Sequence, residues 1–228
     1  MILIYYKQNK FNSNYHTKYN LNYKFLLNSG LNLGNTKKEI YFQNTSIIYG
    51  LRNDFAILKL QNSIYELKKI LKILELTSYR RGVIYFINSY IGFRIIMKTL
   101  FSNNNHYFFL KKNKLERFYL ISKWFPGFLT NNNIYFNTLK FKIKFPRLPH
   151  FGFIGDHNLN FNCLLEFNKI LVPTSSLIDS SAKKTINSMY AIISNGKSLE
   201  SIYFYFFNIL NSIYIGHYNE LKKFKYLS

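Results

Sequence analysis

Acidic residues are scarce in this chain of 228 residues, which has 10 Asp and Glu against 31 Lys and Arg. The formal net charge of +21 makes the folded chain repel itself. A polyanionic partner would relieve that repulsion, with nucleic acid the first candidate and an anionic membrane surface the second. Asn, Lys, Ile, Tyr and Phe dominate the composition, which indicates an AT-rich genome such as that of an organelle. Codon drift toward Lys does not by itself explain the shortage of acids.

Cysteine is nearly absent, since Cys163 is the only one. A single cysteine excludes an internal disulfide and a four-cysteine zinc site. The five histidines show no HxH or HxxxH spacing, so we expect neither a metal site nor a cofactor. Cys163 lies in an apolar, helical setting and is predicted to belong to the core.

Long hydrophobic runs are also missing. The most membrane-like stretch, 201–216, is shorter than the ~20 residues of a membrane span and contains Asn208, Asn211 and Ser212. We therefore predict a buried helix there and no membrane partner. The first residues, MILIYYKQNK, lack a signal-peptide core, and no Arg precedes Arg52, unlike an Arg-rich presequence. If the protein works in an organelle, we expect it to be organelle-encoded.

Short apolar runs alternate with segments of helical periodicity. After the run at 55–60, Ser63 and Glu66 match a capping box at the start of a helix. This alternation predicts an α/β fold with a doubly wound, flavodoxin-like parallel sheet and helices on both faces. We expect a basic N-terminal extension (1–24), a single α/β domain (25–220) and a basic C-terminal tail (221–228). The extension could follow a phosphate backbone or be an unstructured terminus. Strands are predicted at 55–60, 82–87, 106–110, 151–154, 171–174 and 190–193, and helices at 63–75, 91–101, 158–167 and from 198 onward.

The motifs of nucleotide enzymes are missing from this fold. No GxGxxG, GxxxxGK[ST] or GxSxG occurs, and no small-molecule substrate is expected. Asp156 and Asp179 are the acids that follow predicted strands, where a site in such a sheet would form. Asp156 with His157 could be an acid and its orienter, but an Asp at this point more often caps the next helix. An α/β enzyme acting on nucleotides or nucleic acid remains the alternative.

Seven segments, in order, resemble the family of the second protein of the small ribosomal subunit of bacteria and organelles. WFPGFLTN is the most specific of them, since it is similar to the family's Trp-x-x-Gly-x-Leu-Thr-Asn signature. The segments are FLLNSGLNLGN (25–35), IIYGLRNDFAILKLQNSI (47–64), RRGVIYFIN (80–88), WFPGFLTN (124–131), RLPHFGFIGDHN (147–158), KILVPTSSLIDSS (169–181) and YAIISNGKSLESI (190–202).

The resemblance implies a non-catalytic structural protein at the junction of the head and body of the small subunit. Its expected partners are small-subunit ribosomal RNA and neighbouring ribosomal proteins. We favour a mitochondrial ribosome, with a plastid or apicoplast as the alternative. Three features depart from the bacterial pattern: Asn35 replaces a His, Pro126 replaces a Gly, and the span 131–146 is too short for the family's coiled-coil insertion.

Basic and amide side chains in the predicted loops are our candidates for holding RNA, because structured RNA is gripped through phosphates and shape. For any one of them the alternative is a solvated surface charge. Trp124 is expected to anchor its loop by packing rather than to stack on a base. The predicted RNA-binding residues are Lys37, Lys38, Arg52, Asn53, Arg80, Arg81, Lys123, Thr130, Asn131, Arg147, Lys183 and Lys184.

Overall fold

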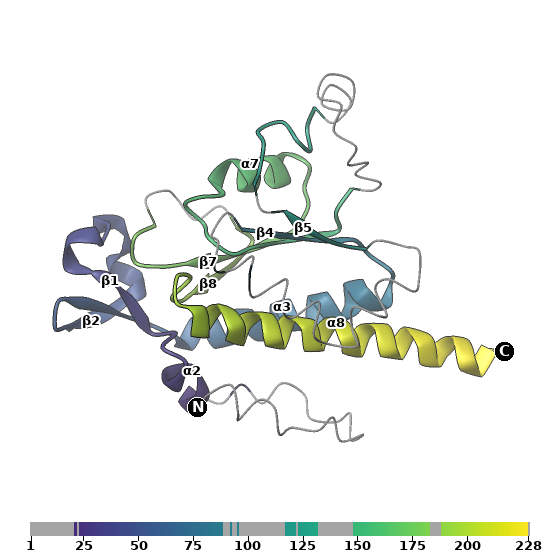
Figure 1. The fold of residues 1–228 in the computed structure, drawn as a ribbon, viewed down its shortest axis with the longest axis horizontal. Coiled ribbons are helices and arrows are strands. Elements are labelled where there is room, and N and C mark those ends of the chain that lie inside the picture. The colour runs from purple at the N-terminus through teal and green to yellow at the C-terminus, as the bar shows by residue number, and fades with distance from the viewer. Residues whose placement is uncertain are drawn as a thin grey trace.

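Five parallel strands form the central sheet of the protein (Figure 1). The structure, a computed structural model, describes residues 21, 23–88, 92, 95, 117–121, 123–131, 148–182 and 188–227. Every neighbouring pair of strands is parallel, in the order β5-β4-β6-β7-β8. Counted along the chain within this sheet, that is the 2-1-3-4-5 order of flavodoxin-like folds, which confirms the predicted class. The strands are β4 (Ile84–Ile87), β5 (Phe118–Ile121), β6 (Phe151–Ile154), β7 (Thr174–Ile178) and β8 (Tyr190–Ile193).

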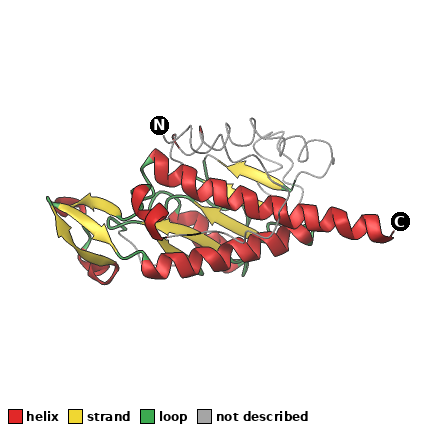
Figure 2. Cartoon of the chain, turned by 90° about the horizontal axis from the view of Figure 1, so that it is seen from below, coloured by secondary structure: helices red, strands yellow, loops and turns green. Residues whose placement is uncertain are grey.

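Helices cover both faces of this sheet, as predicted. The long helices α3 (Gln61–Tyr79) and α8 (Leu199–Leu227) lie side by side under one face (Figure 2), and α7 (Phe161–Lys169) lies over the other. Ile84 and Phe86 of β4 pack in the cluster that contains α3 and α8, while Tyr85 packs in the cluster that contains α7. Because both faces of the strands are buried, their sequences read as apolar runs without alternation.

Two glycines leave room for close contacts with the helix layers. On β6, an added Cβ at Gly152 would lie 2.7 Å from Cε1 of Phe167 on α7. On α8, an added Cβ at Gly216 would lie 2.2 Å from the carbonyl oxygen of Glu75 on α3. The packing distances of both helix layers therefore depend on glycine at these positions.

A separate antiparallel sheet lies beyond the ends of the parallel strands, in the order β1-β3-β2 (Figure 1). The helix α2 (Tyr23–Asn28) precedes it, and two short 3-10 helices, η1 (Lys37–Glu39) and η2 (Phe42–Ile47), connect β1 to β2. Asn53 and Asp54, with φ of 47° and 61°, make the two-residue turn between β2 and β3. Asn and Asp tolerate this left-handed conformation, which tight hairpins require. The strands are β1 (Leu33–Thr36), β2 (Ile48–Arg52) and β3 (Phe55–Leu58).

The structure corrects the prediction for 55–60. This segment does form a strand, but β3 belongs to the antiparallel sheet and is not buried on both faces: Phe55 is exposed, whereas Ala56 and Leu58 are buried. The hairpin turn sets this arrangement, because it pairs β3 with the segment just before it. The capping-box prediction is also wrong, since the Ser63 hydroxyl donates to the carbonyl of Ile193 at 2.6 Å and no side chain caps α3.

Two further strands differ from the sequence prediction. Leu171 and Val172 do not start a strand, because their N–H groups donate back to Asn168 and Phe167 and close the end of α7. The strand β7 begins only at Thr174, after Pro173. The sequence pattern also missed β5, which lies where the alternation breaks down.

Several expectations fall wholly or mainly outside the described residues. These are the helix at 91–101, the strand at 106–110, most of the N-terminal extension (1–24) and the loop in which the coiled-coil insertion is expected to be absent. At the other end, α8 continues through Leu227 and so includes most of the expected basic tail. Among the helices of the described residues, none combines the length and apolar character needed to cross a bilayer.

Candidate nucleic-acid interface

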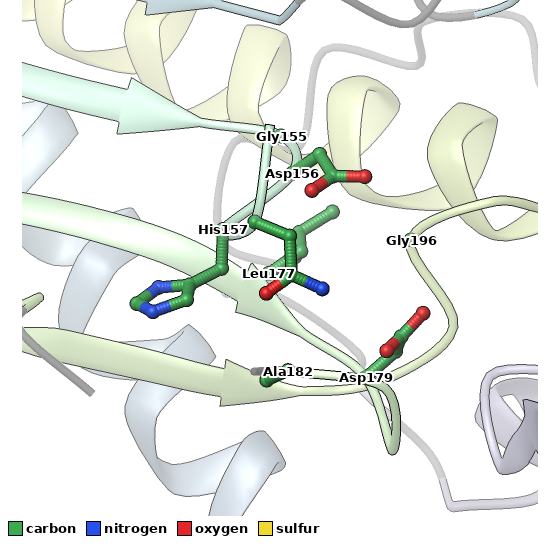
Figure 3. Close-up of a pocket in the computed structure, with 8 residues that line it drawn as sticks. Gly155, Asp156, His157, Leu177, Asp179, Ala182 and Gly196 are labelled. Carbon is green, nitrogen blue, oxygen red and sulfur yellow. The ribbon is translucent and has the colours of Figure 1, made fainter. Parts of the chain in front are cut away.

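A small crevice lies where β6, β7 and β8 end, the position at which related folds bind ligands (Figure 3). Its volume is about 10 Å³, enough for roughly one water molecule, whereas ligand pockets measure ~300–1,000 Å³. Within the described part of the chain, no group of three or more His, Cys, Asp or Glu side chains is placed to hold a metal ion. The lining residues are Gly155, Asp156, His157, Asn158, Leu177, Asp179, Ala182 and Gly196.

Asp156 and His157 do not form a catalytic pair, because their side chains point in opposite directions (Figure 3). An oxygen of Asp156 accepts the N–H of Leu159 at 3.0 Å, so Asp156 caps a turn that precedes α7. The predicted cap on the helix itself is wrong, because α7 begins at Phe161 with Asn160 as its N-cap residue and has no side-chain cap. The buried His157 ring lies 3.3 Å from the Ser176 hydroxyl, which donates in turn to Ser188 at 2.7 Å. Both side chains therefore have structural roles.

Asp179 joins the antiparallel sheet to the parallel one. One carboxylate oxygen accepts the N–H and the hydroxyl of Ser181, both at 2.6 Å. The other lies 3.7 Å from the Lys197 ammonium and accepts the Asn35 amide at 3.4 Å. Next to it, the Asn35 N–H donates to the Ser180 hydroxyl at 2.8 Å. At the strand-end crevice, the chain therefore binds its own antiparallel sheet through Asn35 of β1.

Four of the predicted RNA-binding residues meet at one end of the antiparallel sheet. Lys37 and Lys38 form the start of η1, and Arg52 and Asn53 enter the β2–β3 turn. The Lys37 N–H donates to the carbonyl of Asp54 at 2.7 Å, so the two loops are joined. All four side chains are exposed. We call Lys37, Lys38, Arg52 and Asn53 the hairpin cluster.

Arg80 and Arg81 lie at the opposite end of the parallel strands, where α3 ends and β4 follows. Arg81 adopts the left-handed conformation with φ of 60°, and the Gly82 N–H closes the helix on the carbonyl of Thr77 at 2.7 Å. The Arg81 guanidinium donates to Glu220 on α8, although about half of its side chain is exposed. Arg80 is exposed.

Glu220 is a buried carboxylate with three basic partners. Besides Arg81, it contacts Arg117 at 3.2 Å and His217 at 3.0 Å. Burial alone would raise the pKa of Glu220, but the hydrogen bonds from His217, Arg81 and Arg117 outweigh it and lower the pKa below its ordinary value. These contacts of Glu220 connect the end of α3, the start of β5 and α8.

Lys123, Thr130 and Asn131 are exposed on the loop that follows β5. A second buried carboxylate, Glu166 of α7, holds this loop. It accepts the indole N–H of Trp124 at 3.1 Å and the backbone N–H groups of Gly127 and Leu129 at 2.6 and 3.0 Å.

Aromatic packing completes the anchor of this loop. The Trp124 ring lies 4.9 Å from that of Phe128 and 5.8 Å from that of Phe167, between ring centroids. Trp124 therefore packs against the core, as predicted. The core prediction for Cys163 is confirmed as well, since Cys163 is fully buried and its burial raises the pKa of its thiol.

The predicted residues thus occupy three separate places, and Arg147, Lys183 and Lys184 lie outside the described residues. Sequence reasoning missed Glu166 and Glu220. A signal was present for Glu166, because an acid within the apolar segment CLLEF stands out in a chain with so few acids. Such a residue is buried only when it is paired.

A family model described as "Ribosomal protein S2" matches residues 26–144, more than half of the chain. The chain belongs to the ribosomal protein S2 family. An S2 protein is a structural, non-enzymatic component of the small ribosomal subunit, so the enzyme alternative is set aside.

Individual S2 relatives are distant in sequence. "Small ribosomal subunit protein uS2" of Ehrlichia canis (strain Jake) is 24% identical over 216 residues, which cover 79% of this chain and 70% of the relative. The protein of the same name from Ehrlichia chaffeensis (strain ATCC CRL-10679 / Arkansas) is 24% identical over 216 residues, which cover 79% of this chain and 71% of the relative. "Small ribosomal subunit protein uS2m" of Acanthamoeba castellanii is 25% identical over 177 residues, 78% of this chain and 53% of the relative.

Proposed function

We propose that this S2 protein works in the ribosome of an organelle, a mitochondrion, where it holds small-subunit ribosomal RNA at the junction of head and body. The AT-rich composition and the similarity to a uS2m protein support the organellar assignment. A plastid or apicoplast is the alternative. In this proposal the gene lies in the organelle genome, residues 25–220 act as one ribosomal domain, and 1–24 and 221–228 are basic ends.

The hairpin cluster is the observation that carries the RNA-binding proposal. It places three cations and an amide on two joined loops that project beyond the parallel sheet (Figure 1). Loops joined in this way suit phosphate contacts, which give most of the affinity for RNA and make it dependent on salt. Arg80, the loop residues Lys123, Thr130 and Asn131, and the residues Arg147, Lys183 and Lys184 are proposed as further contacts. Arg81 is proposed to share its guanidinium between Glu220 and RNA.

Neighbouring ribosomal proteins are the other proposed partners, as membership of the S2 family implies. A small-molecule substrate is not part of the proposal, because the strand-end crevice holds about one water molecule. A membrane partner is not part of it either, because the stretch 201–216 belongs to α8, whose residues pack in the core.

The ribosomal assignment is tested by fractionating an extract of the source organelle on a sucrose gradient and locating the chain by mass spectrometry. We expect co-migration with small-subunit RNA that is lost after ribonuclease treatment. Migration as a free protein, or with membranes until detergent is added, would overturn the proposal.

The hairpin cluster is tested with the triple variant Lys37→Gln/Lys38→Gln/Arg52→Gln. Binding of the full chain to a transcript of small-subunit ribosomal RNA is measured across a salt series. We expect the slope of log K against log salt to become shallower by roughly 2 to 3, because three phosphate contacts are lost. The control Lys169→Gln/Lys222→Gln/Lys223→Gln removes the same charge from exposed positions elsewhere. Equal slopes for the two triple variants would exclude the hairpin cluster as the contact.

A further inference from the structure

A hollow runs between the outer side of α3 and the start of the edge strand β8. It is a shallow depression that is open to solvent, and its volume of about 440 Å³ is far larger than that of the strand-end crevice. Three lysines, two tyrosines and one isoleucine line it. They are Tyr65, Lys68, Lys69, Lys72, Ile73 and Tyr190.

The helical period places a ring and two cations together on the exposed side of α3. Tyr65, Lys68 and Lys72 follow the i, i+3, i+7 spacing of one helix face. All three are exposed, and Tyr65 retains 62% of its surface. The opposite face, with Leu67 and Leu71, is buried in the core. Most of the Tyr65 ring surface is therefore open to a planar partner from outside the chain.

Charge in the hollow is positive and partly uncompensated. Lys69 lies 3.0 Å from the Glu66 carboxylate and 4.1 Å above the Tyr65 ring, so it steadies the ring. Among the described residues, no carboxylate lies within ion-pair distance of Lys68 or Lys72. The ammonium groups of Lys68 and Lys72, beside the exposed Tyr65 ring, are therefore available to an anionic partner.

We propose that this hollow binds an unpaired segment of ribosomal RNA, with Lys68 and Lys72 on phosphates and a base against the Tyr65 ring. The inference rests on the proposed function and adds a surface that the loop-based prediction did not include. Single-stranded nucleic acids are held by this combination of basic side chains and exposed aromatic rings. An acidic protein segment would use the lysines but would leave the ring without a planar partner.

The first test measures binding of the full chain to a fluorescein-labelled oligouridylate of about 12 nucleotides, a length within reach of known single-strand sites. We expect Tyr65→Leu to weaken binding about tenfold through loss of base stacking, and Tyr65→Phe to bind as wild type does. For Lys68→Gln/Lys72→Gln the log–log salt slope should become shallower by roughly 1.4. The control Lys169→Gln/Lys222→Gln removes equal charge from other exposed positions.

The second test is ultraviolet cross-linking of the full chain to the small-subunit ribosomal RNA transcript, followed by mass spectrometry of the cross-linked peptides. A nucleotide attached to a peptide from α3 or to Tyr190 supports the proposal. An affinity for oligouridylate that is the same in Tyr65→Leu, Tyr65→Phe and the charge control overturns it. Cross-links from the hollow to a ribosomal protein in assembled subunits also overturn it.

Comparing RNA binding by the hollow variants and by the hairpin triple variant distinguishes a failure of this inference from a failure of the proposed function. If the hollow variants bind the transcript normally while the hairpin triple variant does not, the hollow fails and the proposed function stands. If the wild-type chain does not associate with the transcript at all, the proposed function fails as well. All the substituted side chains are exposed, so circular dichroism should show the fold unchanged.

Discussion

Two buried carboxylates connect parts of this protein that are distant along the chain. Glu166 holds the loop after β5 against α7, and Glu220 joins α8 to Arg81 and Arg117. A chain with 10 acids uses two of them inside the protein, where the cost of burying a charge is offset by several hydrogen bonds. This leaves even fewer acids on the surface to oppose an anionic partner.

Replacing Glu166 with Gln should release the loop that carries Lys123 and Asn131. The amide keeps the shape but offers one acceptor oxygen in place of two, so the three N–H groups cannot all be satisfied. We expect the free energy of unfolding to fall by about 2 kcal/mol. Trp124 is the only tryptophan, so its fluorescence reports this loop during urea unfolding. Glu39→Gln, at an exposed position, is the control, and an equally small effect in both variants would contradict the role of Glu166.

Glu220 should make stability depend on pH. Its folded-state pKa lies below the ordinary 4.5, so the unfolded chain takes up the proton first as the pH falls. The stabilisation is complete above that ordinary pKa and is lost as the pH falls through the lower, folded-state pKa. We expect Glu220→Gln to be less stable than wild type by roughly 1–3 kcal/mol at neutral pH, with a difference that shrinks in acid. Urea unfolding of both proteins over a pH series measures this, and a constant difference would exclude the mechanism.

At the scale of elements, the contact between α3 and α8 depends on a glycine. Gly216 brings the α8 backbone against the carbonyl of Glu75 and close to Ser78, whose hydroxyl donates to the carbonyl of Ile213 at 2.8 Å. The two helices thus meet backbone to backbone at this point and cover one face of the sheet together.

Gly216→Ala should destabilise the protein, although the same change in an exposed helix would stabilise it by about 1 kcal/mol. The added methyl group would overlap the Glu75 carbonyl oxygen, so α8 must move away from α3. We expect a loss of about 2 kcal/mol in the free energy of unfolding, measured by circular dichroism in urea. Gly50→Ala is the control, because an added Cβ there meets no atom within 4 Å. A gain in stability for Gly216→Ala would show that the helices are not in close contact.

Most strands and helices of the parallel sheet could be predicted, because burial on both faces gives continuous apolar runs and helices keep their own period. The ends of elements could not. Both α3 and α7 are followed by a left-handed residue that is not glycine, Arg81 with φ of 60° and Leu171 with φ of 57°, so the usual glycine signal was missing. The antiparallel sheet was missed because periodicity alone does not reveal which strand a segment pairs with.

The sequence indicated which residue types could contact RNA, but it did not indicate which of these residues lie together. Charge and loop position led to Lys37, Lys38, Arg52 and Asn53, and the structure brings these four together. Sequence reasoning passed over Lys68 and Lys72 because they lie on a helix, where a lysine ordinarily means only a solvated face. Their significance comes from Tyr65 and from the hollow beside β8, which requires the tertiary structure.

At the scale of the whole molecule, the chain has an excess of 21 positive charges, and its described residues form an α/β body with an antiparallel sheet at one end. The fold is one that enzymes use, yet the edge where they bind ligands is occupied by contacts within the chain. The proposed RNA contacts lie instead on the hairpin cluster, on the loop held by Glu166 and along α3. A single protein with contacts at several places can hold several RNA segments in a fixed relation.

The junction between the two sheets also determines the order in which parts of the protein can fold during synthesis. Asn35 and Asn44, near the beginning of the chain, are held by Asp179, Ser180 and Ala182, some 136 to 145 positions later. During synthesis the antiparallel sheet has no surface to dock on until that later segment has emerged. The part of the protein made early is therefore fixed late, and it carries exposed lysines throughout the interval.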